Sequence, residues 1–215
     1  MIVIVIEKEI DYDHENIMNK QTSQFYPAPL PVPERLETAV FTLTPLTPAH
    51  AELDLAALMV SKPMLRLWSG SSWPTDDFTL EENIADLEWH FSEHQERIAF
   101  TYTVLTPDET ECLGCIYIKA VQSILPADST LSNNFTNLSA STRFWIKEPR
   151  LTDGLDMQLL QTLQEWFDNA WQFDNHTFHT RAAHKQQVQL LENCDLSRQL
   201  TLDFPNRGGV FYFYG

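Results

Sequence analysis

The sequence has little positive charge, little cysteine and no long hydrophobic run. Lysine and arginine account for 14 of its 215 residues against 30 acidic residues, so the formal net charge is −16. Binding to nucleic acid or to an anionic membrane needs a concentrated basic surface, and we expect neither partner. The opening MIVIVI is too short for a membrane span of about 20 residues or for a secretory signal. We therefore expect a cytoplasmic protein.

Only three cysteines are present, which excludes a disulfide framework and fits a reducing compartment. Two of them form the sequence CLGC at residues 112–115, a spacing found in redox motifs and in half of a zinc site. The segment that follows, IYIKAV, is typical of a strand, and residues three apart on a strand point to opposite faces. We therefore predict ordinary strand cysteines here and no metal ligands.

A composition that is 43% hydrophobic is enough for one sizeable domain. The first part of the chain differs from the rest, because a strand-like IVIVI is followed by a polar stretch and by the proline-rich YPAPLPVPE. This pattern predicts an extended arm at residues 1–37, laid on the surface of a domain at 38–215. The arm would either cover a sheet edge or exchange with a second copy in a homodimer.

Strand and helix signals alternate from about residue 38. Thr47 with Pro48 predicts one helix start, and Thr79 with Glu82 forms a capping box for another. Helices are expected at 49–61, 63–68, from 80 onward, from 155 and at 184–194. Strands are expected at 39–46, 98–107, 112–122, 141–149, 177–183, 200–204 and 209–215. This order predicts an α+β or α/β domain with a mixed sheet of six to seven strands.

Residues 90–94 read HFSEH, which matches the zinc signature of inverted metallopeptidases. A zinc hydrolase would use His90, His94 and Glu93 on one helix, together with a third protein ligand that the sequence does not offer. The apolar stripe of this helix is Leu80, Ile84, Leu87 and Phe91. The two histidines fall beside that stripe, so we expect flanking surface histidines and a chance match to the motif.

The segment LTDGLDMQLLQTLQEWF (151–167) follows a predicted strand and opens a helix. Its apolar face is expected to hold Leu155, Leu159, Leu160, Leu163, Trp166 and Phe167. A strand, a loop with a glycine and a helix N-terminus together suit a bound phosphate. An ordinary strand-to-helix turn has the same pattern, and Asp153 and Asp156 would repel an anion.

The order of elements over residues 38–215 resembles the GNAT acetyltransferase superfamily. FTLTPLTPAH is similar to its opening strand and helix, FWIKEPRLTDGLDMQLLQTL to its acetyl-CoA motif, and HKQQVQLLENCDL to its following helix. FTLEEN, FTYTVLTPDETECLGCIYI and FYFYG resemble uncharacterised bacterial proteins of this kind. The resemblance implies a three-layer fold with a mostly antiparallel sheet and about four helices. It also implies acetyl-CoA as co-substrate, a primary amine as acceptor, and no metal.

The resemblance implies a cofactor site as well. The pantetheine arm would pair with Phe144, Trp145, Ile146 and Lys147 on a strand that splays from its neighbour. The pyrophosphate would lie on Thr152, Asp153, Gly154, Leu155, Asp156 and Met157. His184 stands where the family often has an asparagine near the pantetheine.

Three positions depart from the family pattern, namely Leu151, Asp156 and Leu191. Leu151 replaces the Gln or Arg that opens the family's loop, and Asp156 replaces the second small residue of that loop. Leu191 replaces a tyrosine that often protonates the leaving thiolate. His179 is our candidate for a catalytic base, and a histidine that only fills the sheet surface is the alternative. Trp68, Trp73, Asp76 and Asp77 would bind a cationic substrate, or would belong to a plain surface loop.

These patterns favour an acetyl-CoA-dependent N-acyltransferase that transfers its acetyl group directly to the amine of an unknown small molecule or peptide. A GNAT-fold binding or interaction protein without catalysis is the second hypothesis, supported by the three departures. A zinc hydrolase acting through His90, Glu93 and His94 is the third.

Overall fold

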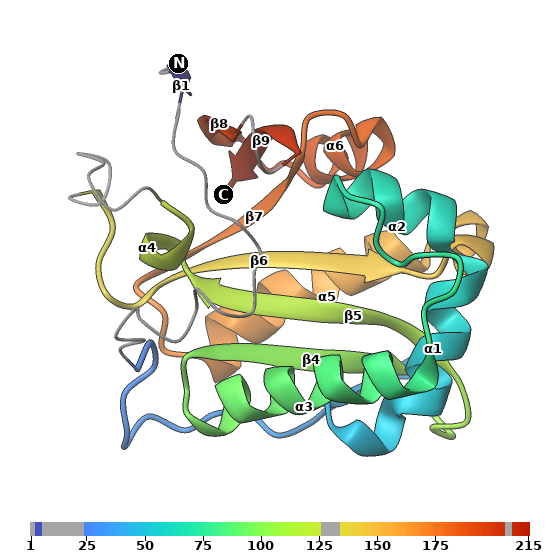
Figure 1. Cartoon of the computed structure of the whole chain (residues 1–215). Coiled ribbons are helices and arrows are strands. Elements are labelled where there is room, and N and C mark those ends of the chain that lie inside the picture. Colours follow the sequence, from blue (N-terminus) through green and yellow to red (C-terminus); the bar gives the residue numbers. More distant parts are fainter. Residues whose placement is uncertain (1–2, 6–23, 126–133, 205–207) are drawn as a thin grey trace.

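The computed structural model of the chain describes residues 3–5, 24–125, 134–204 and 208–215. Within these ranges one sheet has the strand order β1-β8-β9-β7-β6-β5-β4-β3-β2 (Figure 1). The pairs β1·β8 and β6·β7 are parallel and the others antiparallel. The predicted α+β class is confirmed, with nine strands in place of six or seven. The strands are β1 (Val3–Val5), β2 (Leu36–Glu37), β3 (Thr42–Pro45), β4 (Ala99–Leu105), β5 (Cys112–Ala120), β6 (Ser139–Ile146), β7 (Asn175–Arg181), β8 (Arg198–Phe204) and β9 (Gly209–Tyr214).

The helices begin where the sequence indicated. The capping box is present, because the Thr79 side chain accepts from the Glu82 N–H and the Glu82 carboxylate accepts from the Thr79 N–H. No helix in the described ranges has the length and apolar character needed to cross a membrane. The helices are η2 (Pro48–His50), α1 (Ala51–Val60), α2 (Lys62–Ser69), α3 (Leu80–Gln95), α4 (Val121–Ile124), η4 (Glu148–Asp153), α5 (Leu155–Ala170) and α6 (Lys185–Asn193).

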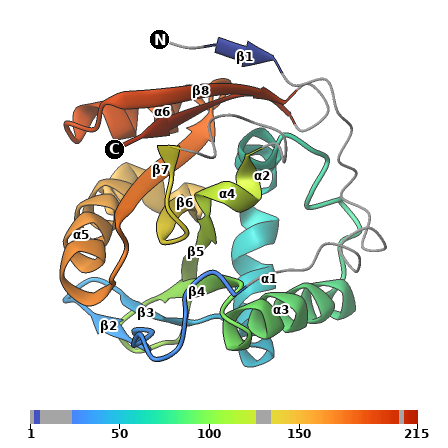
Figure 2. The ribbon, with the colours of Figure 1, turned by 90° about the vertical axis from the view of Figure 1, so that its left-hand side faces the viewer.

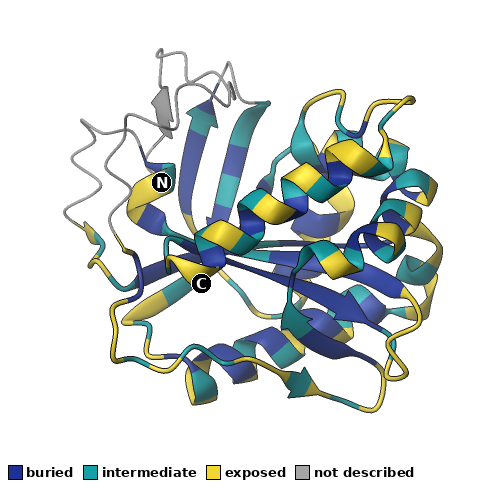
Figure 3. Ribbon diagram, turned by 60° about the horizontal axis from the view of Figure 1, so that its bottom comes forward, coloured by how far each residue is buried: buried dark blue, intermediate teal, exposed yellow. Residues whose placement is uncertain are grey.

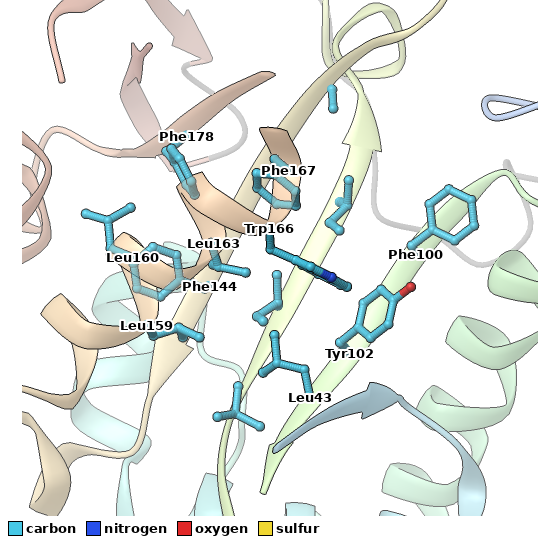
Figure 4. Packing of buried hydrophobic residues seen from close by; sticks show 14 of the residues in the cluster. Leu43, Phe100, Tyr102, Phe144, Leu159, Leu160, Leu163, Trp166, Phe167 and Phe178 are labelled. Carbon is cyan, nitrogen blue, oxygen red and sulfur yellow. The ribbon is translucent and has the colours of Figure 1, made fainter. Parts of the chain in front are cut away.

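Helices cover both faces of the sheet, α5 on one side and α1 and α3 on the other (Figure 2). The apolar face predicted for α5 is confirmed, and its six residues pack on β4, β5 and β6 (Figure 4). Central strands are buried while the outer helix faces are exposed (Figure 3). Burial of each large apolar side chain contributes about 1.5–3 kcal/mol, so α5 is held firmly.

The N-terminal segment is more deeply integrated than expected. Phe25 and Tyr26 are buried against Phe100, so the expectation of a surface arm is wrong at these residues. The Arg97 guanidinium holds the chain there by donating to the carbonyls of Tyr26, Pro27 and Leu30. At the far edge of the sheet, Val3–Val5 forms the predicted short strand and pairs with β8. Most of the polar stretch that follows it lies outside the described residues.

Helix α3 buries a different stripe from the one the apolar pattern indicated. Asn83, Leu87, His90 and His94 face inward and are buried. Ile84 and Phe91 of the expected stripe lie at its margin and are only half-buried. The two histidines are therefore not surface residues. His94 packs edge-on against Phe100 and Tyr102, and burial lowers its pKa to about 4.

Acid is expected to destabilise the protein through His94. Its pKa is about 4 when folded and 6.5 when unfolded, so the unfolded chain binds the proton first as the pH falls. The free energy of unfolding then decreases between pH 6.5 and 4, by about 3 kcal/mol from this residue. We expect His94→Gln to flatten that decrease in urea unfolding experiments. A variant that loses stability between these pH values as steeply as the wild type would contradict the assignment.

Candidate functional site

Strands β6 and β7 are parallel neighbours that pair along only part of their length. Their register runs from Ser139 opposite Asn175 to Thr142 opposite Phe178. Beyond Phe178, β7 pairs with β9 alone, and in Figure 1 it runs away from β6 toward α6. The second half of β6 is thereby left with an open flank, as expected of a splayed strand.

Main-chain groups of β6 face into this gap. The Lys147 N–H donates to the Leu113 carbonyl of β5, so the alternate residues Phe144 and Ile146 direct their main-chain groups toward β7. The Phe144 carbonyl accepts two side-chain hydrogen bonds, at 2.9 Å from Trp68 Nε1 and 2.8 Å from Gln187 Nε2. Side chains from α2 and α6 therefore occupy the position of a partner strand.

Gln187 bridges the two strands, because its Oε1 also accepts from Thr180 Oγ1 of β7 at 2.7 Å. The cavity that remains between Trp68, Phe144, Gln187 and the start of α5 has a volume of about 20 Å³. That is room for about one water molecule. The gap is therefore largely filled by the chain's own side chains.

His184 lines the same cavity and is 94% buried, with a relative exposure of 6%. Its Nδ1 accepts from the Gln187 N–H at 3.1 Å and caps α6. Burial lowers the pKa of His184, so the ring is neutral at pH 7 and its proton is on Nε2. Among the described residues Nε2 has no hydrogen-bond partner. A buried N–H donor without an acceptor is costly, and a carbonyl group of a ligand would satisfy it.

The predicted phosphate loop is a 3-10 turn, η4, that meets α5 at Gly154. Gly154 has a φ of +69°, and no atom lies within 4 Å of the position of a Cβ. Thr152 and Asp153 are exposed, Leu155 is buried in the core, and Met157 is half-buried. The loop thus has the glycine and the open space that close approach of a ligand would require.

The charges around this loop are largely acidic. The Asp156 carboxylate accepts from the Met157 N–H at 2.9 Å and thereby occupies the N-terminus of α5. Burial raises the pKa of Asp156. Both nearby cations are already paired, Lys147 with Glu111 and Arg150 with Asp153 and Glu111. An anion at this helix N-terminus would therefore meet one carboxylate and no unpaired cation among these residues.

His179 lies beside the start of the gap, on the face of the sheet opposite to α5. Its Nδ1 is 2.7 Å from Ser141 Oγ, and Thr177 Oγ1 donates to Ser141 at 3.1 Å. The ring stacks on Phe213. Burial, then the charges of Arg143 and Lys119, lower the pKa of His179 well below its usual value. His179 is therefore neutral at pH 7.

Two arginines that the sequence analysis did not select hold α2 against this gap. Arg143 Nη2 donates to the Trp68 carbonyl, and the Arg143 guanidinium lies 3.9 Å from the centroid of the Trp68 ring. Arg181 donates to the carbonyls of Leu67 and Gly208. Arg143 of β6 and Arg181 of β7 point to the same face of the sheet as His179. Residues two apart on a strand share a face, and this spacing in the sequence could have identified both arginines.

The remaining substrate residues proposed from sequence do not gather around the gap. Trp68 does, but Trp73 packs on Phe78. Asp76 forms ion pairs with Lys62 and Arg66, at 3.0 and 2.8 Å, and Asp77 is exposed. The expected cation-binding group of two tryptophans and two aspartates is thus not assembled, because Asp76 is paired with Lys62 and Arg66 of α2.

Comparison with solved structures identifies the architecture. The chain superimposes on RimL, a ribosomal L7/L12 α-N-protein acetyltransferase in complex with coenzyme A, with a TM-score of 0.64 and 15% identity over 84% of this chain and 96% of RimL. The fold is that of the GNAT acetyltransferases. A ribosomal-protein-S5-alanine acetyltransferase from Vibrio fischeri gives a TM-score of 0.65 and 12% identity over 85% of this chain and 95% of that chain. The microcin C7 self-immunity acetyltransferase MccE, in complex with acetyl-CoA and AMP, gives a TM-score of 0.63 and 13% identity over 82% of this chain and 92% of that chain. No protein-family model and no curated protein sequence matches the chain.

Leu191 and the HFSEH segment are the remaining positions that the sequence analysis singled out. Leu191 is buried in the core that α5 covers, and it does not line the cavity. HFSEH lies on α3, where His90 Nδ1 is 3.4 Å from Thr101 Oγ1 and 3.5 Å from Glu93. Within the described ranges, neither histidine belongs to a group of three residues whose donor atoms converge for a metal. In HFSEH, His90 and His94 thus form part of the contact between α3 and β4.

The position of Asp156 generates a binding prediction. We expect Asp156→Asn to tighten the binding of coenzyme A by about two- to fivefold at low salt, since one like charge at a helix N-terminus costs about 0.3–1 kcal/mol. Calorimetric titration measures this. Asp168→Asn, an exposed acid at the other end of α5, is the matched control. Equal effects of the two substitutions would show that only net charge matters.

Proposed function

We propose that the chain is an N-acyltransferase that transfers an acetyl group from acetyl-CoA to a primary amine. The observation that carries this proposal is the gap between β6 and β7, with main-chain groups on one side and the unpartnered His184 Nε2–H on the other. The similar structures include complexes with coenzyme A and with acetyl-CoA. The acceptor amine, whether on a small molecule or a peptide, is not specified by these features.

The residues fit acetyl-CoA in three respects. Phe144 and Ile146 offer main-chain groups to the pantetheine, and His184 Nε2 offers a donor to one of its carbonyls. Residues 152–157 offer a helix N-terminus to the pyrophosphate. The main-chain groups of Trp145 and Lys147 do not join them, because these alternate residues direct their main-chain groups toward β5. Bound acetyl-CoA would supply the acetyl group as a thioester.

Entry of a pantetheine requires Gln187 to leave the Phe144 carbonyl, because a volume of about 20 Å³ does not admit it. Gln187 would then give up its bonds to Phe144 and Thr180, and the Phe144 carbonyl would be free to accept from a pantetheine amide. His179, neutral and on the other side of the gap, would accept a proton from the incoming ammonium group on its unprotonated ring nitrogen, with Ser141 Oγ relaying the proton where that nitrogen is Nδ1.

A binding or interaction protein without catalysis is the second candidate. Two observations favour it specifically, namely the gap filled by Trp68 and Gln187 and the acidic surroundings of the loop. Such a protein would bind acetyl-CoA weakly or not at all, and would release no coenzyme A with any amine. The two candidates differ in turnover, so one assay separates them.

Titration with acetyl-CoA tests the proposal directly. We expect saturable binding by the wild type, tighter binding by Gln187→Ala because the gap is cleared, and binding weakened by about 10-fold in His184→Ala through loss of one hydrogen bond. His184→Asn, which keeps a cap and a donor, should restore most of the affinity. If neither the wild type nor Gln187→Ala binds at millimolar acetyl-CoA, the acyltransferase proposal is wrong.

The role of His179 has its own test, with a panel of peptides and small amines and release of free coenzyme A as the readout. We expect His179→Ala to lower kcat by about 100-fold with little change in the affinity for acetyl-CoA. His176→Ala, on the same strand but packed against Phe167 of α5, is the control and should retain kcat. Equal kcat values for the two variants would remove His179 from the mechanism.

A further inference from the structure

Three metal-ligating side chains meet in the core beneath α1 and α3, apart from the gap between β6 and β7. Asp54 comes from α1, and Cys112 and Cys115 come from β5, with relative exposures of 3%, 1% and 1%. One donor atom from each lies within 4.8 Å of the other two. No other group of three such residues converges in the described part of the chain.

A β-bulge brings the two cysteines together. On a regular strand, residues three apart would face opposite sides, as the sequence analysis assumed. In β5, Cys112 is opposite Leu105 but Gly114 is opposite Val104, so Leu113 is an extra residue and the alternation shifts by one. A Cβ at Gly114 would lie 2.0 Å from the Trp145 carbonyl oxygen. Glycine is therefore required at the bulge that turns both thiols toward Asp54.

The spacing of the donor atoms suits a tetrahedral ion. Asp54 Oδ1 lies 3.3 Å from Cys115 Sγ and 4.0 Å from Cys112 Sγ. Zinc bonds of about 2.3 Å to sulfur and about 2.0–2.2 Å to oxygen place tetrahedral S and O ligands about 3.5 Å apart. The two observed separations lie on either side of that value.

Asn83 of α3 supplies a further polar group. It is fully buried, its amide interacts with the Asp54 carboxylate, and its Nδ2 donates to the Ala51 carbonyl at 2.9 Å. Its Oδ1 has no hydrogen-bond partner among the described residues. The amide nitrogen faces Asp54 in this structure, so a flip of the amide group would turn Oδ1 toward the three donor atoms as a fourth ligand.

We propose that Asp54, Cys112 and Cys115, with Asn83 as the fourth group, form a structural site for one divalent metal ion of the zinc class. Two sulfur ligands select zinc over calcium or magnesium. Binding would displace the two thiol protons, and the charge of the dication would offset that of two thiolates and one carboxylate. Full burial leaves no open position for a substrate, so the ion would join α1 to β5 and would not react.

The experiment measures metal in the full-length protein, purified without a polyhistidine tag or chelator, by elemental analysis and native mass spectrometry. We expect one zinc per chain, a Tm that falls with a strong chelator and returns with zinc, and thiolate-to-metal absorption when cobalt(II) replaces zinc. Cys112→Ser and Cys115→Ser should each weaken zinc binding by more than about 100-fold. Cys194→Ser, the remaining cysteine, is the matched control and should leave zinc binding unchanged.

Two results would overturn the proposal. One is wild-type protein that carries no metal and takes up neither zinc nor cobalt(II) at micromolar concentration, including protein whose intact mass shows a Cys112–Cys115 disulfide. The other is bound zinc that survives both serine substitutions and is lost in His94→Gln. Because chelation and reloading are followed on the wild type, the test does not depend on whether the serine variants fold.

Discussion

The separation of β6 from β7 beyond Thr142 and Phe178 is the constraint on which the rest of this end of the molecule depends. A buried main-chain carbonyl must be hydrogen-bonded, and the Phe144 carbonyl has lost its strand partner. Trp68 and Gln187 replace that partner, which places the C-terminal end of α2 and the first turn of α6 at the gap. Arg143 and Arg181 then hold α2 there through main-chain carbonyls.

The same replacement sets a limit on affinity. A ligand that enters the gap exchanges existing hydrogen bonds for its own, and each such bond contributes only about 0.5–1.5 kcal/mol net. Little is gained from the Phe144 carbonyl, which is already satisfied. In the proposed complex the gain would come from His184 Nε2, which has no hydrogen-bond partner among the described residues. Recognition of acetyl-CoA would therefore depend on the single unsatisfied donor of His184 more than on the exposed strand.

The sequence predicted what depends on local periodicity and capping, and missed what depends on neighbouring strands. The apolar face of α5 and the Thr79 capping box follow from spacing alone, and both are present. The inward face of α3 does not follow from spacing, because its polar residue Asn83 is stabilised by donating to the Ala51 carbonyl of another helix. The positions of the two cysteines depend on the bulge at Gly114, which packs against the Trp145 carbonyl of β6. The residues around CLGC do not indicate this contact with a neighbouring strand. Gln187 and Arg181, which lie at the gap, were missed because each donates a hydrogen bond to an element far away in the chain.

The bulge at Leu113 also bears on how the β4–β5 hairpin can change length. Because side chains alternate with a period of two, loss of the one extra residue would move every side chain on one flank of the bulge to the other face of the sheet. Ile116 and Ile118 lie in the core under α5, while Cys115 and Tyr117 face α1 and α3. A single-residue deletion in this strand would therefore exchange two buried surfaces at once, whereas the exposed turn at residues 107–111 tolerates insertion. We therefore expect this hairpin to accept a change of length at its tip and not within the strand.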